Sequence, residues 1–351
     1  APPPALAAPY GIIDLRYAEM ARRAGYYICY TTNYQPAYLG ELPLQLPRLE
    51  VFGDFKLADF ANSMKGALLP TVVDRGSDDL ISVVVPADNA AATIEATLSS
   101  LAAQSHQNLE IIVVDDGSTD DTVARAQAMA ATEPRLRIIS QPRSGLAAAR
   151  NTGWRAARGA AIAFVDADDL SAPDNIRLLY SALQGASEAA EQTSGKPPGL
   201  AYGWSTQIDA RGDFIKRYPV IFNFGDVLAD LIAVNFIANA SASMVWRHVL
   251  EAVDGFAAPR GGQDVEGADA LLFHLRVAER YGFVQVAQYL TQDRQRPRAV
   301  SGYASRDMRT WYVATDEIVS RHPELKDAQR RGAQQFAMQA MSEAIRARRV
   351  L

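Results

Sequence analysis

From about residue 80 onward, apolar positions along the chain follow two alternating patterns. One is a short continuous apolar run, of the kind that forms a strand buried on both faces of a sheet. Such runs lie at residues 80–86, 109–114, 135–140 and 160–166. Between them, apolar residues recur at the spacing of one helical face, as Ile94, Leu98 and Leu101 do. Strands and helices that alternate in this way predict an α/β fold with a doubly wound, mostly parallel sheet flanked by helices.

The second half of the chain continues with more mixed patterns. Small, polar and Pro/Gly-rich residues at 185–199 predict a surface loop. Beyond it, we expect two strands around a turn at 210–213 and a helix that begins near Asp269. From about residue 307, the pattern predicts helices to the C-terminus.

The first part of the chain has a different texture. Residues 1–79 scatter Pro and Tyr among short apolar pieces, and we find no chemistry in them. The sequence therefore predicts three regions. They are an N-terminal extension of unknown role at 1–79, a domain at 80–304 and a C-terminal helical segment at 305–351.

Composition narrows the class of protein. With 351 residues, 48% of them hydrophobic, the chain can bury a sizeable core. Its net charge of -5 comes from 35 basic and 40 acidic residues spread along the chain. The sequence thus has no basic cluster of the kind that binds nucleic acid, which argues against a nucleic-acid-binding function. Cys29 is the only cysteine, so an intrachain disulfide and a CxxC zinc or redox site are excluded. No apolar run reaches the length of a membrane span and we recognise no signal peptide. We therefore expect a cytoplasmic protein, at most peripheral to the inner face of the membrane.

Acidic residues crowd the end of the fourth apolar run, in the segment AFVDADDLSAPDNI. The carboxylates of Asp166, Asp168 and Asp169 repel one another, and a hard divalent cation held by one or two of them would relieve the repulsion. Another acidic pair, in VVDDGS, follows the second run. Because ligands bind beyond the carboxyl ends of parallel strands, both clusters are expected to face one crevice. An alternative is that SAPDN, at the end of the segment, merely starts a helix.

Several motifs agree in order and spacing with one known family. The segments SVVVPADNAAATIEATLSSLAAQSHQNLEIIVVDDGSTDDT, GLAAARNTGWRAARGAAIAFVDADD and NASASMVWRHVLEAVDGF resemble family 2 glycosyltransferases of the GT-A fold. The resemblance covers roughly residues 80 to 300. It implies inverting transfer of a sugar from a nucleoside diphosphate sugar, with UDP as the expected nucleotide, to a hydroxyl of a glycan, lipid-linked or protein acceptor. Such transfer is typical of bacterial polysaccharide and glycan biosynthesis.

The resemblance also implies a nucleotide-sugar site at the strand ends. Asp116 would contact the base while Asp115 supports the loop, and Arg150 would lie near the nucleotide unless it forms only a salt bridge on a helix surface. Asp166 and Asp168 would form the Asp-x-Asp motif that binds the donor and a divalent cation, Mn²⁺ or Mg²⁺. The other residues expected near the donor are Pro86, Ala87, Asp88, Ala167, Arg294 and Arg296. Asp88 departs from the family, in which an aromatic residue is common at this position.

Inverting transfer also needs a base that takes the proton from the acceptor hydroxyl. The family has a Glu-Asp pair before a helix similar to LLFHLRVAER, whereas this chain reads GGQDVEGAD there, without such a pair. The resemblance points to Asp269, with Asp264 and Glu266 as alternatives. Asp269 could instead serve only the dipole of its helix. His274 is expected to pack within the protein rather than to bind a ligand.

Other classes of protein stay open beside the transferase. A non-catalytic nucleotide-sugar-binding module would keep the fold without turnover, and the missing Glu-Asp pair favours it. A sugar-nucleotide pyrophosphorylase shares the sheet but should carry a Gly-rich, Arg-containing loop after the first strand, where this chain reads VPADNAAAT. A phosphoacceptor domain would use the acids of VVDDGS but would leave the later motifs unexplained.

Overall fold

The computed structural model of the protein describes most of the chain after residue 77. The described residues are 5–7, 28–31, 46–47, 78–190, 195–218, 221, 223–237, 239–257, 268–295 and 303–350. Asp264, Glu266 and Arg296, each predicted to belong to the site, lie outside the described residues. The chain divides into two compact units, of which the first is Ala1–Val73 with Val220–Phe222 and the second is Asp74–Pro219 with Asn223–Leu351. The predicted region boundaries after residues 79 and 304 stay predictions.

In the first unit, the described residues form three short strands in a parallel sheet of order β1-β2-β3. These strands are β1 (Ala5–Ala7), β2 (Ile28–Thr31) and β3 (Leu46–Pro47). The registers align Leu6 with Cys29 and Tyr30 with Leu46. Strands this short show no period in a sequence, which is why none was predicted here.

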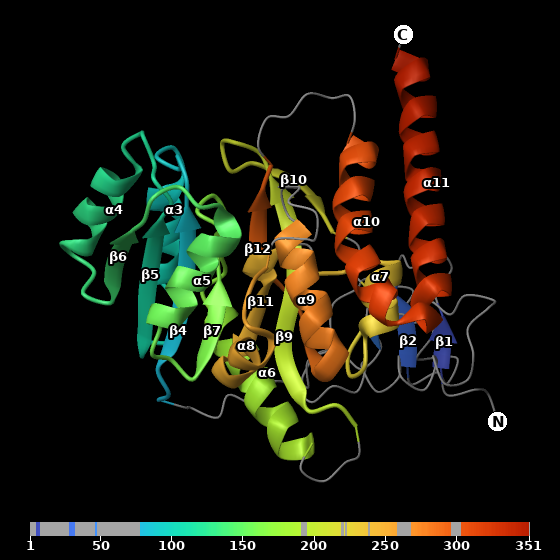
Figure 1. The fold of residues 1–351 in the computed structure, drawn as a ribbon, viewed down its shortest axis with the longest axis horizontal. Coiled ribbons are helices and arrows are strands. Elements are labelled where there is room, and N and C mark those ends of the chain that lie inside the picture. Colours follow the sequence, from blue (N-terminus) through green and yellow to red (C-terminus); the bar gives the residue numbers. More distant parts are fainter. Residues whose placement is uncertain are drawn as a thin grey trace. The chain divides into compact units, whose positions relative to one another are not determined.

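The second unit is built on one large sheet (Figure 1). Its strands are β4 (Ile81–Ala87), β5 (Leu109–Asp115), β6 (Leu136–Ser140), β7 (Ala161–Phe164), β8 (Leu170–Ser171), β9 (Pro198–Ile208), β10 (Phe214–Arg217), β11 (Ser243–Trp246) and β12 (Gly282–Arg294). Within the described residues their order is β6-β5-β4-β7-β11-β9-β12-β8, with β10 beside β9. The first four strands in this order pair in parallel, as β9 and β12 do, while β8, β10 and β11 pair antiparallel with their neighbours. The predicted mostly parallel sheet is confirmed.

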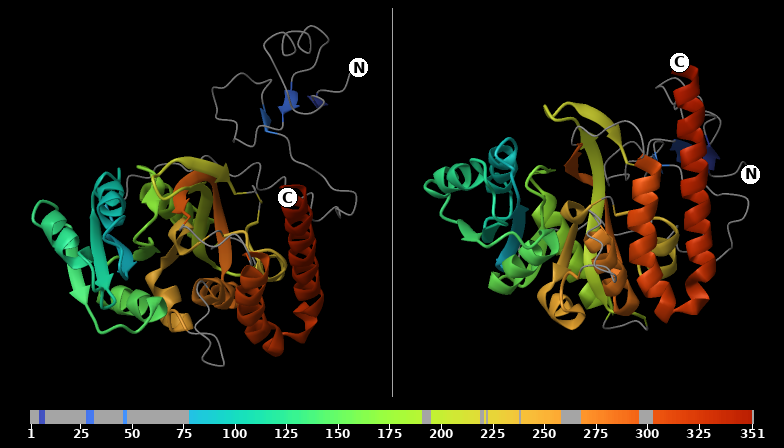
Figure 2. Two further views of the ribbon diagram at one scale, coloured as in Figure 1. Left: turned by 90° about the horizontal axis from the view of Figure 1, so that it is seen from above. Right: turned by 45° about the horizontal axis from the view of Figure 1, so that its top comes forward.

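Helices cover both faces of this sheet, as the view from above in Figure 2 shows. They are α3 (Ile94–Ala102), α4 (Thr122–Ala130), α5 (Leu146–Ala156), α6 (Asn175–Ala190), α7 (Leu228–Ala233), α8 (Arg247–Val253), α9 (Ala268–Arg280), α10 (Tyr303–Arg321) and α11 (Lys326–Val350). Val84 and Ile112 point to the face whose core includes α5, α8, α9 and α10. On the other face, α3 packs against α4, and α6 packs on β9, β11 and β12. Because both faces are covered, every residue of β4 and β5 is buried, as their continuous apolar runs predict.

Helix α5 lies very close to strand β4. A Cβ atom on Gly153 would lie 2.2 Å from Cγ1 of Val84 and 3.2 Å from Cγ2 of Val114. This approach therefore requires a residue without a side chain. Arg150, one turn earlier on α5, is brought by the same packing towards the strands.

The structure corrects one sequence prediction in this unit. The loop predicted at 185–199 begins later, because α6 continues to Ala190. Ala186 and Glu188 favour helix, so the small and polar composition of this stretch was a misleading loop signal. The hairpin predicted around 210–213 is confirmed, since β9 ends at Ile208 and β10 begins at Phe214.

Two helices, α10 and α11, end the chain as predicted and lie side by side, joined through the short 3₁₀ helix η3 (Pro323–Leu325) (Figure 1). Trp311 anchors α10, because its indole Nε1 donates a hydrogen bond of 2.8 Å to the carbonyl oxygen of Ile232. Gly332 of α11 passes over the same indole, where a Cβ atom would lie 2.4 Å from Cζ2. None of the helices in the described part of the chain is both long enough and apolar enough to span a membrane.

Candidate functional site

The sheet topology gathers the predicted acidic residues at one edge. Strands β4, β5 and β7 are parallel neighbours, so their carboxyl ends lie side by side. Asp88 directly follows β4, Asp116 directly follows β5 and Asp166 comes two residues after β7. This is the edge at which open parallel sheets bind ligands.

Arg150 of α5 connects two of the predicted site residues. Its guanidinium donates from Nη2 to Oδ1 of Asp166 at 2.7 Å and from Nη1 to Oδ2 of Asp269 at 2.5 Å. The Arg150 side chain is 3% exposed and lies over the ring of Phe256, 5.4 Å from its centroid. Burial lowers the pKa of Arg150, but the charges of Asp166 and Asp269 outweigh burial and raise its pKa above the ordinary value. The alternative of a salt bridge on a helix surface is therefore wrong for Arg150.

Asp166 and Asp169 begin and end a tight turn after β7. The backbone N–H of Asp169 donates to the carbonyl oxygen of Asp166 at 3.0 Å. The Asp169 carboxylate accepts hydrogen bonds from Ser241 Oγ at 2.6 Å, Asn239 Nδ2 at 2.8 Å and the backbone N–H of Arg294 at 2.9 Å. Burial, with the nearby charge of Asp166 added to it, raises the pKa of Asp169 well above its ordinary value. Asp169 thus holds the turn together and is a poor candidate for a metal ligand.

Asp166 and Asp168 fit a cation site that is shared with a substrate. Both side chains are partly exposed, and the hydrogen bond from Arg150 occupies only Oδ1 of Asp166. Within the described residues, no group of three or more His, Cys, Asp or Glu side chains is placed to hold a metal ion. Mg²⁺ typically binds through one or two carboxylates and completes its shell with water and substrate phosphates. Two carboxylates at a strand end match that type of site.

Between these two acids, the backbone of Ala167 is fixed by α3. The carbonyl oxygen of Ala167 accepts hydrogen bonds from Thr93 Oγ1 at 2.9 Å and from Thr97 Oγ1 at 3.0 Å. Ala167 itself is 6% exposed. The Asp-x-Asp segment is therefore held from both sides, by α3 at its middle and by Arg150 at its first residue.

Asp116 organises the loop that leads into α5. Its Oδ1 accepts hydrogen bonds from Gln141 Nε2 at 2.7 Å and from the backbone N–H of Ser144 at 2.8 Å. Its Oδ2 accepts one from the backbone N–H of Gly145 at 2.7 Å. Asp115 Oδ1 accepts a hydrogen bond from the backbone N–H of Ser118 at 3.1 Å, which supports the turn that directly follows β5. The contact of Asp116 with a nucleotide base stays a prediction.

The residues around the end of β4 combine a buried strand with an exposed ion pair. Pro86 and Ala87 are buried in β4. The carboxylate of Asp88 pairs with the guanidinium of Arg143, and Asn89 Nδ2 donates to the same carboxylate at 3.0 Å. The position at which the family often has an aromatic residue is thus occupied here by one half of an ion pair.

Arg294 lies at the end of β12. It connects the turn at residues 166–169, called the acidic turn below, to the β9–β10 hairpin. Its Nε donates to the carbonyl oxygen of Asp168 at 2.9 Å. Its Nη1 donates to the carbonyl oxygens of Asp209 and Ala210 at 3.1 and 3.2 Å. The structure therefore gives Arg294 a bracing role beside Asp168, and its predicted contact with a diphosphate stays a prediction.

Helix α9 contributes Asp269 and His274. Asp269 lies in the first turn of the helix, with 12% of its side chain exposed, and is paired with Arg150 as described above. His274 is 1% exposed and lies 3.2 Å from Ser243 Oγ through its Nε2. Burial, helped by the charge of Arg150, lowers the pKa of His274 to about 3. The prediction that His274 packs within the protein is confirmed.

Some residues that shape this site were not predicted. Ser241 and Asn239 hold Asp169, and Thr93 holds Ala167. Tyr218 donates a short hydrogen bond from its hydroxyl to Asp293, whose charge also acts on Asp169. Hydroxyl and amide side chains are common on protein surfaces, so their types gave no signal. Only the folded arrangement identifies them, because they lie before α3, between α7 and β11, and directly after β10, far along the sequence from the turn after β7.

Comparison with known proteins supports the resemblance seen in the sequence. The family model described as Glycosyl transferase family 2 matches residues 82–239. A glycosyltransferase of Rickettsia felis is 30% identical over 177 residues, which are 50% of this chain and 26% of that protein. The chondroitin synthase of Escherichia coli is 40% identical over 99 residues, which are 28% of this chain and 14% of that protein. The chain therefore spans only about a quarter or less of these relatives.

Solved structures are similar in fold. The mannosyltransferase PcManGT from Pyrobaculum calidifontis, in complex with GDP-Man and Mn²⁺, superposes with a TM-score of 0.52 at 21% identity, over 81% of this chain and 82% of that one. Residues 1–349 of S. aureus TarS in complex with UDP-GlcNAc superpose with a TM-score of 0.50 at 19% identity, over 68% and 66% of the two chains. Residues 82–239 therefore match the family 2 glycosyltransferase model, and the likenesses to solved structures show that the chain has the GT-A fold.

Proposed function

We propose that the protein is a metal-dependent, inverting glycosyltransferase that moves a sugar from a nucleoside diphosphate sugar to an acceptor hydroxyl. The observation that carries this proposal is the position of Arg150, which pairs with both Asp166 and Asp269. A residue of the donor motif and the candidate base thus share one guanidinium. The relatives and the fold support the reaction class, and the UDP-GlcNAc and GDP-Man complexes of the structural neighbours support a nucleotide sugar as donor.

The donor side of the proposed site consists of Asp166, Asp168 and Arg150. Asp168 and Oδ2 of Asp166 would hold Mn²⁺ or Mg²⁺, in agreement with the Mn²⁺ in the PcManGT complex. A divalent cation there would stabilise the negative charge that develops on the leaving diphosphate. The ion pair with Arg150 keeps the Asp166 carboxylate in one orientation, which is a condition for binding a metal and a substrate together.

The acceptor side of the proposed site is Asp269. Its Oδ2 is held by Arg150, while its Oδ1 makes no hydrogen bond with the residues that the structure describes. Oδ1 would accept the proton of the acceptor hydroxyl as the hydroxyl oxygen attacks the anomeric carbon. His274 cannot take this role, because it is buried five residues further along α9 and has a lowered pKa.

We also consider a non-catalytic module that binds a nucleotide sugar, because one observation favours it. The charge of Asp269 is already offset in part by Arg150, and no Glu-Asp pair stands at the start of α9. A module of this kind would retain nucleotide and metal binding at Asp166 and Asp168. It would form no product.

A combined binding and product experiment tests the proposal. Thermal unfolding of the full chain is followed with nucleoside diphosphates and their sugars, each with manganese and with a chelator. A ligand that binds the folded state raises the unfolding temperature. We expect at least one nucleotide to do so in manganese but not in the chelator. Release of the nucleoside diphosphate from the stabilising donor is then measured. No stabilisation by any nucleotide contradicts the proposal, and stabilisation without turnover on any acceptor supports the binding module instead.

A further inference from the structure

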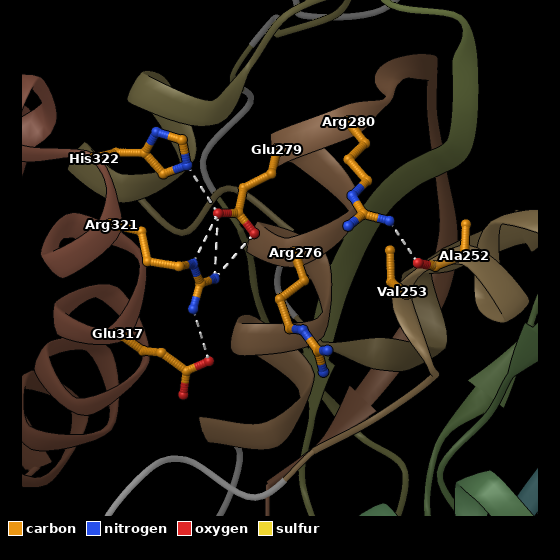
Figure 3. A pocket seen from close by; sticks show the side chains of 8 residues that line it. All are labelled: Ala252, Val253, Arg276, Glu279, Arg280, Glu317, Arg321 and His322. Carbon is orange, nitrogen blue, oxygen red and sulfur yellow. Dashed lines mark hydrogen bonds and ion pairs between the residues drawn. The ribbon is translucent and has the colours of Figure 1, made fainter.

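Helix α9 begins at the candidate site and ends beside a hollow. This hollow has a volume of about 500 Å³. It is lined by the end of α8, the last turns of α9 and the end of α10 with His322 (Figure 3). Asp269 lies in the first turn of α9, whereas the lining residues Arg276 and Arg280 lie in its last turns. At 1.5 Å per residue, Arg276 is displaced by roughly 10 Å along the helix from Asp269.

The acidic side chains of this hollow already have partners. Glu279 accepts hydrogen bonds from Arg321 Nη2 at 3.0 Å and interacts with His322 Nε2 at 2.9 Å. Glu317 accepts one from Arg321 Nη1 at 3.3 Å. Figure 3 shows these four side chains grouped together on one side of the hollow. Arg321 therefore offsets part of the negative charge of the two carboxylates.

Two arginines on the other side lack acidic partners. Arg276 is partly buried and makes no hydrogen bond or ion pair with any residue that the structure describes. Arg280 donates one hydrogen bond of 2.7 Å, to the carbonyl oxygen of Ala252, and has no carboxylate partner among those residues. Because the two arginines are four positions apart on α9, they lie on one side of the helix and repel each other. A bound anion would remove that repulsion.

We propose that this hollow is a binding site for a small molecule that carries an oxyanion, either phosphate or carboxylate. The planar guanidinium of Arg276 donates to none of the described residues, and its fork matches two oxygens of either group. Arg280 adds a second positive charge. Ala252 and Val253 offer an apolar wall to the carbon part of the ligand. The volume lies within the range of small-molecule sites.

This site is separate from the proposed donor site. It shares no lining residue with the acidic turn at Asp166, Ala167 and Asp168. It also needs no metal, since its positive charge comes from arginines. The inference therefore holds or fails independently of the proposed transfer reaction.

Titration calorimetry of the full chain tests the site, with inorganic phosphate and acetate as separate probes, at constant ionic strength and with a chelator present. We expect phosphate or acetate to bind, and Arg276→Gln and Arg280→Gln each to weaken that binding roughly tenfold or more, because each removes a charge-assisted hydrogen bond. Arg276→Lys should retain part of the affinity. Arg330→Gln is the matched control, because Arg330 is 77% exposed, pairs with Asp327 on α11 and is not among the residues that line the hollow.

The outcomes separate this site from the donor site. Binding of either probe that is lost in the Arg276 and Arg280 variants, but kept in Arg330→Gln, supports the proposal and names the oxyanion. Absence of binding to the unchanged protein, or equal binding in all variants, overturns it. Nucleoside diphosphate binding with manganese is measured on the same variants and should not change. Circular dichroism confirms that each variant is folded.

Discussion

Arg150 and Asp269 are 119 positions apart in the sequence and form a buried ion pair with an Nη1–Oδ2 distance of 2.5 Å. The pair joins α5, which packs on β4 and β5, to the first turn of α9. Arg150 also binds Asp166, so one guanidinium is the shared partner of two carboxylates. Without it, both negative charges would be partly removed from water with no positive charge beside them, which is unfavourable. The stability of the domain and the geometry of the candidate site therefore depend on the same side chain.

Replacing this guanidinium should destabilise the protein strongly. Arg150→Met leaves Asp166 and Asp269 without their shared partner, and removing one member of a buried pair costs roughly 3–5 kcal/mol. Arg155→Met is the control on the same helix, because Arg155 is 53% exposed and lies 3.4 Å from Asp254. An exposed pair of this kind contributes at most about 1 kcal/mol. Urea unfolding of both variants measures the two costs, and similar values would contradict the importance given to the buried pair.

The sequence predicted much of this fold because the strands of the parallel half have a simple composition. Runs such as ISVVVPA and LEIIVVD are apolar at nearly every position, which is a clear sign of burial on both faces. The end of α6 was missed because alanine, serine and glutamate in the stretch before residue 191 suit both a polar loop and a helix. The short strands β1 to β3 are too brief to show any period.

The contact between α5 and β4 gives a prediction about packing. Gly153→Ala would place Cβ 2.2 Å from Val84 Cγ1, and the adjustment should cost roughly 1–3 kcal/mol. Gly185→Ala is the control in another helix, since its Cβ would meet nothing within 4 Å. Alanine is a better helix former than glycine, so this control should stabilise the protein by up to about 1 kcal/mol. Thermal unfolding should thus move in opposite directions for the two substitutions.

The lowered pKa of His274 predicts a dependence of stability on pH. His274 stays neutral in the folded protein down to a pKa of about 3, whereas in the unfolded chain it takes up a proton near pH 6.5. Its contribution to stability is therefore complete above pH 6.5 and is lost as the pH falls towards 3. Between pH 7 and pH 5 the loss should be about 2 kcal/mol. His274→Gln, which keeps an amide near Ser243, should remove this part of the acid sensitivity.

Urea unfolding of the unchanged protein and of His274→Gln at the two pH values checks this prediction. Other titrating groups act in both proteins, so the difference between their pH responses isolates His274. Equal responses would show that His274 is not held neutral by the fold.

The site residues could be predicted from the sequence only where a motif names them. Asp166 and Asp168 follow a buried strand, and the position of Asp269 follows from the helix after it. The hydrogen bonds that fix these residues come from Arg150, Thr93 and other side chains that are distant in the sequence. Such contacts depend on the order of strands in the sheet, for which a single sequence gives no direct signal.

The two carboxylates of the acidic turn lead us to expect that nucleotide binding depends on a divalent metal ion. Asp168→Asn removes a charged ligand and should weaken nucleoside diphosphate binding in manganese roughly tenfold or more, which corresponds to the loss of one interaction with a charged group. In a chelator, the substitution should have little effect. Asp174→Asn is the control, since Asp174 is half exposed and bound to Ser105 and Arg177. Calorimetry that gives equal affinity in manganese and in chelator for the unchanged protein would exclude metal dependence.

The final prediction concerns the base. If Asp269 takes the acceptor proton, Asp269→Asn should lower sugar transfer roughly 10²- to 10⁴-fold, the usual contribution of general-base catalysis. Donor and metal affinity should stay nearly the same, because an asparagine oxygen can still accept the hydrogen bond from Arg150 and the metal site lies at Asp166 and Asp168. Asp264→Asn and Glu266→Gln should cost much less. Single-turnover transfer with the natural acceptor decides between the three, since a variant of Asp269 that transfers at the original rate would rule this residue out. If one of the other two substitutions abolishes transfer instead, the base lies at that position.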